Sequence, residues 1–216
     1  MNSPIAYLFT QPYPPIDHPI YSNIPSHAMM IGVDGGTNVM DRLQIKPNLI
    51  IGDMDSIQLE VLSRYEESTT ILRYPTEKNE TDCELAIRWC IENGISEVII
   101  LNALTGRVDH ILGMLQNLLY AKQNGMKAQI VSGDQKILFL DNDYSFHEEP
   151  GTRISLIPFS SIVSGVLTYG LEYPLRGEDL FQEQSRGISN VVLQGTARIQ
   201  HTSGELLLII SNSTLK

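Results

Sequence analysis

The chain is short of the residues and segments that mark several classes of protein. Its 216 residues include only two cysteines, and no apolar run approaches the ~20 residues that a membrane span requires. Cys83 and Cys90 lie in one predicted helix, about 10.5 Å apart along its axis, which is too far for a disulfide. The N-terminus lacks the basic start and apolar segment of a secretion signal. We therefore expect a cytoplasmic protein with two reduced core cysteines and no membrane segment.

Basic residues are also scarce. Lys and Arg number 15 against 25 Asp and Glu, which gives a formal net charge of -10. A protein that binds nucleic acid normally carries a basic patch, so this balance argues against such a partner. It leaves a phosphorylated substrate open, because a bound metal ion can reverse the local sign of charge.

Apolar runs and turn signals predict two domains of different class. Over residues 1–143, strand-like runs alternate with helical segments, which is typical of an α/β domain with a mostly parallel, Rossmann-like sheet. The predicted strands are 5–9, 28–33, 49–51, 70–74, 98–101, 128–131 and 137–140. Over residues 144–216, short strand-like runs are separated by turns without a convincing helix, which predicts an all-β sandwich or partial barrel. These runs are 154–157, 165–168, 191–194, 197–200 and 206–210.

Several helix boundaries can be read from capping signals. Ser56 is a plausible N-cap for a helix over 57–66. Thr81 and Glu84 match a capping box, and the helix that they begin is expected to end at Asn93 before a glycine. Two further helices are predicted over 38–43 and 108–123.

Acidic residues follow two of the predicted strands. Asp34 opens the run Asp34-Gly35-Gly36, and Asp53 and Asp55 follow the next strand. Ligands of open parallel sheets bind beyond the carboxyl ends of strands. In an extended segment Asp53 and Asp55 point to the same side, where Mg²⁺ would relieve their repulsion. The two glycines would let a ligand approach the backbone. Alternatively, these acids only stabilise glycine-containing turns.

A second group of polar residues lies around two predicted helix starts. Asp82 either complements the helix dipole or lies near a metal or nucleotide. Arg107 is a candidate phosphate ligand, since a guanidinium binds phosphate in a forked geometry. Lys78 is either a further basic contact or a solvated side chain. His110 contacts a ligand or simply starts a helix, and Asp109 completes this acidic set.

A polar break near the C-terminus precedes an apolar strand. Ser189 and Asn190 are either part of an ordinary turn or recognise a heteroaromatic ring through hydrogen bonds.

Taken together, these segments resemble thiamine pyrophosphokinases in order and spacing, and the resemblance covers nearly the whole chain. The segments that carry it are 34–36, 47–56, 77–82, 106–110 and 185–190. The resemblance implies transfer of a diphosphoryl group from ATP to the hydroxyl of thiamine, giving thiamine diphosphate and AMP. It also implies that residues 1–143 bind ATP and Mg²⁺, that residues 144–216 bind thiamine, and that two chains form a homodimer with active sites at the subunit interface.

The resemblance also implies roles for individual residues. Asp53 and Asp55 would be Mg²⁺ ligands, and the catalytic residues would be Asp82, Arg107 and Asp109. One of these two acids would accept the hydroxyl proton of thiamine, and the residues alone do not decide between them. The nucleotide and thiamine contacts would be Asp34, Gly35, Gly36, Lys78, Asn79, Thr81, His110, Ser189 and Asn190.

Two positions depart from the family pattern. Asn79 stands where the family usually has Asp, so metal affinity should fall unless Glu77 or Glu80 compensates. Thr105 stands where a glycine is common, and its side chain could narrow the approach of a ligand to the backbone.

Three other functions remain open from the sequence. A pyrophosphokinase of the same fold could act on another heterocyclic alcohol, such as a hydroxymethylpterin. A non-catalytic thiamine or nucleotide sensor would bind ligand without forming AMP, with Asn79 as the change that disabled it. A structural protein with incidental acids would not bind ATP in a Mg²⁺-dependent way.

Overall fold

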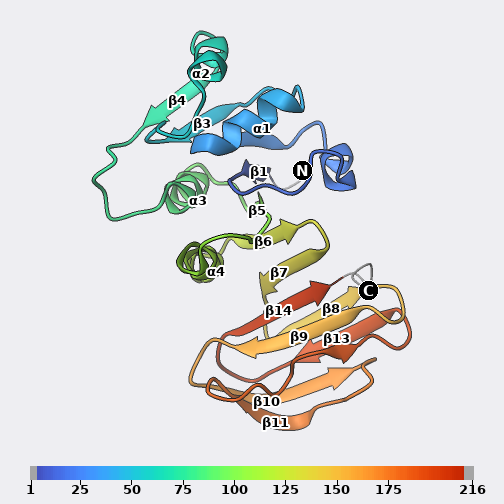
Figure 1. Cartoon of the computed structure of the whole chain (residues 1–216). Helices are drawn as coiled ribbons and strands as arrows, with labels where there is room; N and C mark the ends of the chain where they lie inside the picture. Colours follow the sequence, from blue (N-terminus) through green and yellow to red (C-terminus); the bar gives the residue numbers. More distant parts are fainter. Residues whose placement is uncertain (1–3, 212–216) are drawn as a thin grey trace. The chain divides into compact units, whose positions relative to one another are not determined.

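The computed structural model describes residues 4–211 and divides into two compact units, Met1–Gly133 and Asp134–Lys216 (Figure 1). The domain boundary expected at residue 143 stays a prediction. Strand β7 (Gln135–Phe139), which precedes that residue, pairs antiparallel with β14 (Leu206–Ser211) of the second unit.

The strands of the first unit form a parallel arrangement, which confirms the mostly parallel sheet. In space they follow the order β6-β5-β1-β2-β3-β4, and each pair of neighbours is parallel. The label Rossmann-like stays a prediction. The strands are β1 (Ile5–Phe9), β2 (Met29–Val33), β3 (Leu49–Gly52), β4 (Thr70–Arg73), β5 (Glu97–Leu101) and β6 (Lys127–Ser132).

The order of these strands creates a crevice between β1 and β5. After β1 the chain continues to β2 on one side, whereas after β5 it continues to β6 on the other side. The loops that leave the two neighbouring strands therefore diverge. Ligands of open α/β sheets bind at such a switch point.

Helices and the Pro-rich segment cover the sheet of the first unit. The helices are η1 (Pro19–Asn23), η2 (Asp34–Gly36), α1 (Thr37–Arg42), α2 (Leu59–Tyr65), α3 (Asp82–Glu92) and α4 (Val108–Gln123). Tyr7 and Phe9 of β1 pack with Val39 and Met40 of α1, and Tyr21 stacks on Phe9 with ring centroids 6.2 Å apart. Four half-buried side chains of the loop over residues 12–27 therefore pack against this core, namely Tyr13, Ile20, Tyr21 and Ile24.

The predicted helix ends are partly right. Thr81 caps α3, because its hydroxyl accepts a hydrogen bond from the Glu84 amide at 3.2 Å, and Asn93 is the C-cap. The N-cap predicted at Ser56 is wrong. Helix α2 starts two residues after Ile57, behind Gln58 and without a side-chain cap, while the Ser56 amide donates to Asp34 Oδ1 instead.

The second unit consists of two antiparallel layers, in the orders β12-β9-β14-β7 and β11-β10-β13-β8. Side chains from both layers share one apolar core, including Leu156, Val166, Ile199 and Leu208, and its described residues contain no helix. This confirms an antiparallel β domain. The strands not yet given are β8 (Asp143–His147), β9 (Arg153–Pro158), β10 (Ile162–Tyr169), β11 (Arg176–Phe181), β12 (Asn190–Val191) and β13 (Thr196–Gln200).

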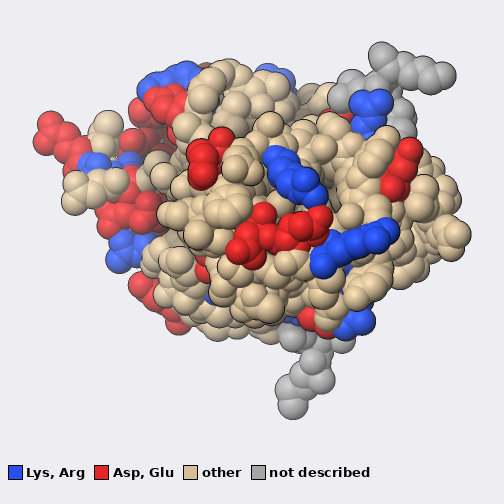
Figure 2. All heavy atoms as spheres, turned by 90° about the horizontal axis from the view of Figure 1, so that it is seen from below, with Lys and Arg blue, Asp and Glu red and all other residues tan. Residues whose placement is uncertain are grey.

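Three global expectations can be compared with the structure. Cys83 and Cys90 are free thiols, both buried, and burial raises the pKa of each to about 12. Within residues 4–211, no helix combines the length and hydropathy of a membrane span. The third expectation concerns the basic patch of proteins that bind nucleic acid. On the face shown in Figure 2, acidic and basic side chains lie in small groups separated by uncharged surface.

Candidate functional site

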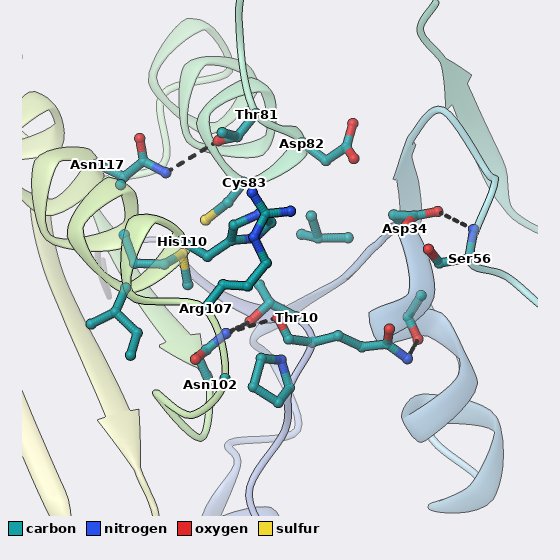
Figure 3. Close-up of a pocket in the computed structure, with 18 of the residues that line it drawn as sticks. Thr10, Asp34, Ser56, Thr81, Asp82, Cys83, Asn102, Arg107, His110 and Asn117 are labelled. Atoms are coloured by element: carbon teal, nitrogen blue, oxygen red, sulfur yellow. Dashed lines mark hydrogen bonds between the residues drawn. The ribbon is translucent and has the colours of Figure 1, made fainter. Parts of the chain in front are cut away.

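A cavity of about 1050 Å³ in the first unit collects most of the residues singled out in the sequence (Figure 3). Thr10 and Gln11, which follow β1, and Asn102, which follows β5, line it, so it opens at the crevice between those strands. The predicted site residues among its lining are Asp34, Gly35, Lys78, Thr81, Asp82, Arg107, Asp109 and His110.

Three carboxylates come together at one end of this region. Asp34 begins η2 directly after β2, Asp53 follows β3, and Asp82 is the first residue of α3. Each offers an oxygen, and these oxygens all lie within 4.8 Å of one another. Two neighbouring parallel strands and the start of a helix thus deliver one acid each, although the residues span 48 positions of the chain (82 minus 34).

Two glycines allow close contacts around this group, Gly52 beside Asp34 and Gly36 beside strand β1. Gly52 has φ +147, and a Cβ there would lie 2.9 Å from the Asp34 Cβ. A Cβ on Gly36 would lie 1.9 Å from the carbonyl oxygen of Phe9, which is backbone and cannot move aside. The predicted use of Gly36 was to admit a ligand. In the structure it admits the neighbouring strand β1, and it is not part of the cavity lining of the described chain.

Lys78 lies among the carboxylates. Its Nζ donates to Asp53 Oδ2 at 3.3 Å and lies 3.0 Å from Asp82 Oδ1, with only 12% of its side chain exposed. Burial lowers the pKa of Lys78, but the carboxylates of Asp82 and Asp53 raise it by more, so the pKa is higher than its ordinary value. The ammonium therefore stays charged and compensates part of the acidic group.

The acids differ in their protonation behaviour. Burial raises the pKa of Asp82, and this effect exceeds the opposing attraction of Lys78. For Asp53 partial burial also works upward, but the backbone amide of Asp55 and the ammonium of Lys78 hold its pKa below the ordinary value. A half-buried carboxyl with a raised pKa beside other acids is a candidate for a functional site.

Asp55 does not join this group. The expectation that residues 53–55 are extended is wrong, because Met54 has φ +70, in the left-handed region. The Asp55 side chain is exposed, and its Oδ1 accepts a hydrogen bond from Ser56 Oγ at 2.8 Å. Its role as a metal ligand stays a prediction.

A second charged pair lies across the cavity at the start of α4. Arg107 Nε donates to Asp109 Oδ1 at 3.1 Å, and a second bond joins Nη2 to the other oxygen. This hydrogen bonding lowers the pKa of Asp109. Both side chains are mostly exposed, at 71% and 62%, so the pair is held loosely. His110 lines the cavity beside them.

Four polar residues that the sequence did not single out support the walls: Gln11, Asn102 and Asn117 line the cavity, and Asn38 lies outside its lining. Asn102 is buried, donates to Thr10 Oγ1 at 2.8 Å and accepts from the Leu104 amide at 2.7 Å, so it joins the loops after β1 and β5. Gln11 donates to the Gly35 carbonyl at 3.0 Å. The two others are Asn38, which holds the 56–58 backbone, and Asn117, which donates to Thr81 Oγ1. No sequence signal separates such residues from ordinary surface amides.

The two departures from the family pattern lie in different places. Asn79 is exposed and is not in the cavity lining of the described residues, so the missing charge falls outside the group of Asp34, Asp53 and Asp82. Glu80 lines the cavity but is paired with Arg88 of α3. Thr105 does line the cavity, beside Gly106.

Ser189 and Asn190 belong to the second unit, and their side chains have different tasks. Asn190 is buried, accepts from the Tyr173 amide at 3.0 Å and donates to the Tyr173 carbonyl at 2.7 Å. Its side-chain amide is thus used to fasten one segment to another. Ser189 is exposed, with φ +60, and its backbone amide donates to Ser155 Oγ at 3.1 Å.

Comparisons with known proteins match both units. The family described as "Thiamin pyrophosphokinase, catalytic domain" matches residues 21–130, and "Thiamin pyrophosphokinase, vitamin B1 binding domain" matches residues 143–206. The chain belongs to the thiamine pyrophosphokinase family. Its function is therefore that of a thiamine diphosphokinase, which transfers the diphosphoryl group of ATP to thiamine and releases AMP.

Individual members of the thiamine pyrophosphokinase family agree with this assignment. The thiamine pyrophosphokinase of Bacillus subtilis (strain 168) is 30% identical over 188 residues, which cover 86% of this chain and 88% of that protein. Thiamine pyrophosphokinase 1 of Oryza sativa subsp. japonica is 31% identical over 182 residues, or 79% of this chain and 68% of that protein. The crystal structure of thiamine pyrophosphokinase from Bacillus subtilis has a TM-score of 0.86 at 26% identity, covering 97% of this chain and 99% of that one.

Proposed function

We propose that the cavity of the first unit binds the polyphosphate of ATP, together with a divalent cation, Mg²⁺ in the cell, held by Asp34, Asp53 and Asp82. The observation that carries this proposal is the convergence of three carboxylate oxygens within 4.8 Å of one another. Asp34 and Asp82 line the cavity, and Asp53 joins them from outside its lining among the described residues. Carboxylate oxygens are the ligands that Mg²⁺ prefers.

The donor set fits such an ion. Asp82 Oδ1 is buried and accepts no well-aligned hydrogen bond within the described chain, its neighbour being the ammonium of Lys78. Three carboxylates against one ammonium also leave negative charge uncompensated. When bound there, a divalent cation neutralises phosphate charge and stabilises the AMP leaving group.

Positive side chains complete the phosphate site. Arg107 lines the cavity with an exposed guanidinium that can present two parallel donors to phosphate oxygens. Lys78 approaches from the side of the acids. Thr81 lies at the N-terminus of α3, where the helix dipole also favours negative charge. Phosphoryl transfer needs this positioning and charge neutralisation more than covalent chemistry.

We assign acceptance of the thiamine hydroxyl proton to Asp109. Asp82 is committed to the group with Asp34 and Asp53, whereas Asp109 lines the cavity outside it. The hydrogen bonds from Arg107 hold the pKa of Asp109 below its ordinary value, so the carboxylate is an ionised acceptor at neutral pH. When Arg107 turns to phosphate, Asp109 loses these bonds and becomes a stronger base for the hydroxyl proton.

The second unit supplies the thiamine contact through Ser189. Its hydroxyl is on an exposed side chain, whereas Asn190 supports the segment through Tyr173. We therefore keep Ser189 as a thiamine ligand and assign Asn190 a supporting role, which differs from the contact expected for it.

We also propose a homodimer with shared active sites. Four large apolar side chains of the second unit are at least half exposed: Tyr169, Tyr173, Ile188 and Leu193. Their segments run together, since the Leu193 amide donates to the Gly170 carbonyl at 2.9 Å. Exposed apolar surface of this kind is typical of contact sites between proteins. Sedimentation equilibrium of the active enzyme should give twice the monomer mass of 24.2 kDa, and an active monomer would rule out a shared site.

The test of the proposed function is product formation from ATP and thiamine, with Mg²⁺ and with EDTA. We expect AMP and thiamine diphosphate in equal amounts, and neither product in EDTA. Hydroxymethylpterin should give no product in thiamine's place, and a preference for it would reassign the substrate. Thiamine or ATP binding without AMP would instead indicate a sensor.

A further inference from the structure

The ammonium of Lys78 contacts carboxylate oxygens of Asp53 and Asp82 that a bound cation would also use. Its Nζ lies 3.0 Å from Asp82 Oδ1 and 3.3 Å from Asp53 Oδ2, and it also donates to the Pro75 carbonyl at 3.1 Å. Two of the three acids of the proposed metal group are therefore paired with this ammonium.

The ammonium and a divalent cation cannot use these oxygens independently. Both are positive, and the two carboxylates lie within a few ångströms of Nζ. The repulsion between the ammonium and a cation bound at these carboxylates remains appreciable at such distances, even where water screens it. A cation that binds Asp53 and Asp82 must therefore push the ammonium away or bind more weakly.

The side chain of Lys78 can move from the acids into the cavity. It lies in the loop between β4 and α3 and is itself part of the cavity lining. A lysine ammonium sits on a flexible four-carbon stem with rotatable donors, so it can move by several ångströms without moving the backbone. In the cavity it would meet the phosphates of ATP.

We propose that Lys78 is a resident counter-ion of the acidic group, displaced by the divalent cation and transferred to the ATP phosphates. The proposal rests on the metal site proposed above. Without metal, Lys78 holds Asp53 and Asp82 together against their repulsion. With metal and nucleotide, the cation takes the place of the ammonium beside the acids, and the same lysine charge serves phosphate.

This proposal predicts effects of opposite sign for the two ligands. Replacing Lys78 by Met removes the competitor of the metal and a partner of the phosphates. Without nucleotide, Lys78→Met should bind Mn²⁺ about tenfold more tightly than the wild type. In EDTA, the same variant should bind ATP about tenfold more weakly, because Asp53 and Asp82 lose the charge that compensates them and then repel the phosphates. Lys78→Arg keeps the positive charge and should stay within about threefold of the wild type for both ligands.

The experiment is titration of the full-length chain with Mn²⁺, followed by electron paramagnetic resonance, and with ATP in EDTA, followed by calorimetry. Lys136→Met is the matched control, because it removes a lysine paired with a carboxylate, Glu148, in the second unit. It should leave both affinities unchanged. Lys78→Gln provides a second neutral variant, and thermal unfolding verifies that each variant is folded.

Each outcome decides the matter. Tighter Mn²⁺ and weaker ATP binding in both neutral variants supports the counter-ion role. Weaker binding of both ligands would make Lys78 a structural cross-link and overturn it, as would unchanged Mn²⁺ binding. If the wild type binds Mn²⁺ and Asp53→Asn does not, the metal site stands whatever Lys78 does. If the wild type binds no Mn²⁺, the metal site and the counter-ion role both fall.

Discussion

Replacing Asp53 by Asn is expected to reduce thiamine diphosphate formation by about 10³-fold while leaving the fold intact. Asp53 supplies one of three carboxylate oxygens that lie within 4.8 Å of one another. The amide keeps the size of the side chain but removes its charge, and a lost metal ligand forfeits several kcal/mol of stabilisation of the transferring phosphoryl group. AMP release at saturating Mg²⁺ and ATP measures the loss.

The fold should be kept in this variant, with at most a small loss of stability. Asp53 is paired with Lys78, and the Asp55 amide and this ammonium hold its pKa below the ordinary value, so the ionised carboxylate contributes to the folded state at neutral pH. Thermal unfolding in EDTA should therefore occur at the wild-type temperature or slightly below it. Added Mg²⁺ should raise the unfolding temperature of the wild type only, because a ligand stabilises the state that binds it.

Asp17→Asn is a suitable control, since Asp17 is an exposed acid outside the cavity lining of the described residues. It removes the same charge and should leave turnover unchanged. Near-normal activity of Asp53→Asn at ordinary Mg²⁺ concentrations would reject Asp53 as a metal ligand and with it the proposed acidic group.

Replacing Arg107 is expected to have the second largest effect. Arg107→Lys should lower kcat/KM for ATP by about 10²-fold, and Arg107→Met by about 10³-fold. Lysine keeps the charge but cannot present two parallel donors to a phosphate. The side chain is 71% exposed and has little packing to lose, so stability should not change. Steady-state rates at varied ATP give the ratio.

The chain offers a close match for a control. Arg198 binds Asp143 in the same forked manner as Arg107 binds Asp109, with Nε 2.8 Å from Oδ1, but it lies in the second unit. Arg198→Lys should leave kcat/KM unchanged. Equal, small effects of the two lysine substitutions would mean that Arg107 only fastens Asp109 and does not bind phosphate.

The sequence predicts much of the first unit because its signals are local. The α4 helix has the expected bounds, 108–123, and Thr81 caps α3 through its hydroxyl. Buried parallel strands such as β5 are continuous apolar runs, which leave little ambiguity. By contrast, β8 and β11 were not predicted. Both are edge strands of their layer, and edge strands are often polar.

In the acidic group, too, local sequence signals predict one part of the arrangement and miss another. The sequence places Asp34 and Asp53 beyond the ends of neighbouring strands, and in the structure they lie together. From the sequence we expected Asp53 and Asp55 to lie side by side. In the structure Asp53 lies beside Asp82, which is 29 residues later in the chain (82 minus 53) and begins a helix. A left-handed residue such as Met54 is not encoded by a glycine or asparagine, so no pattern announces the turn that separates Asp53 from Asp55.

Buried polar partners are the least predictable part. The position of the Lys78 ammonium between Asp53 and Asp82 depends on how the loop after β4 folds back. Asn190 looks like a ligand contact in the sequence, but its amide is occupied by the backbone of Tyr173, which lies 17 residues away. Such contacts are determined by tertiary packing and not by local pattern.

The most direct test is diffraction at the manganese absorption edge from crystals soaked in Mn²⁺ and a non-hydrolysable ATP analogue. We expect an anomalous peak within coordination distance of Asp34, Asp53 and Asp82, next to the phosphates of the nucleotide in the cavity. A manganese peak elsewhere, with these three carboxylates uncoordinated and the nucleotide bound, would contradict the account.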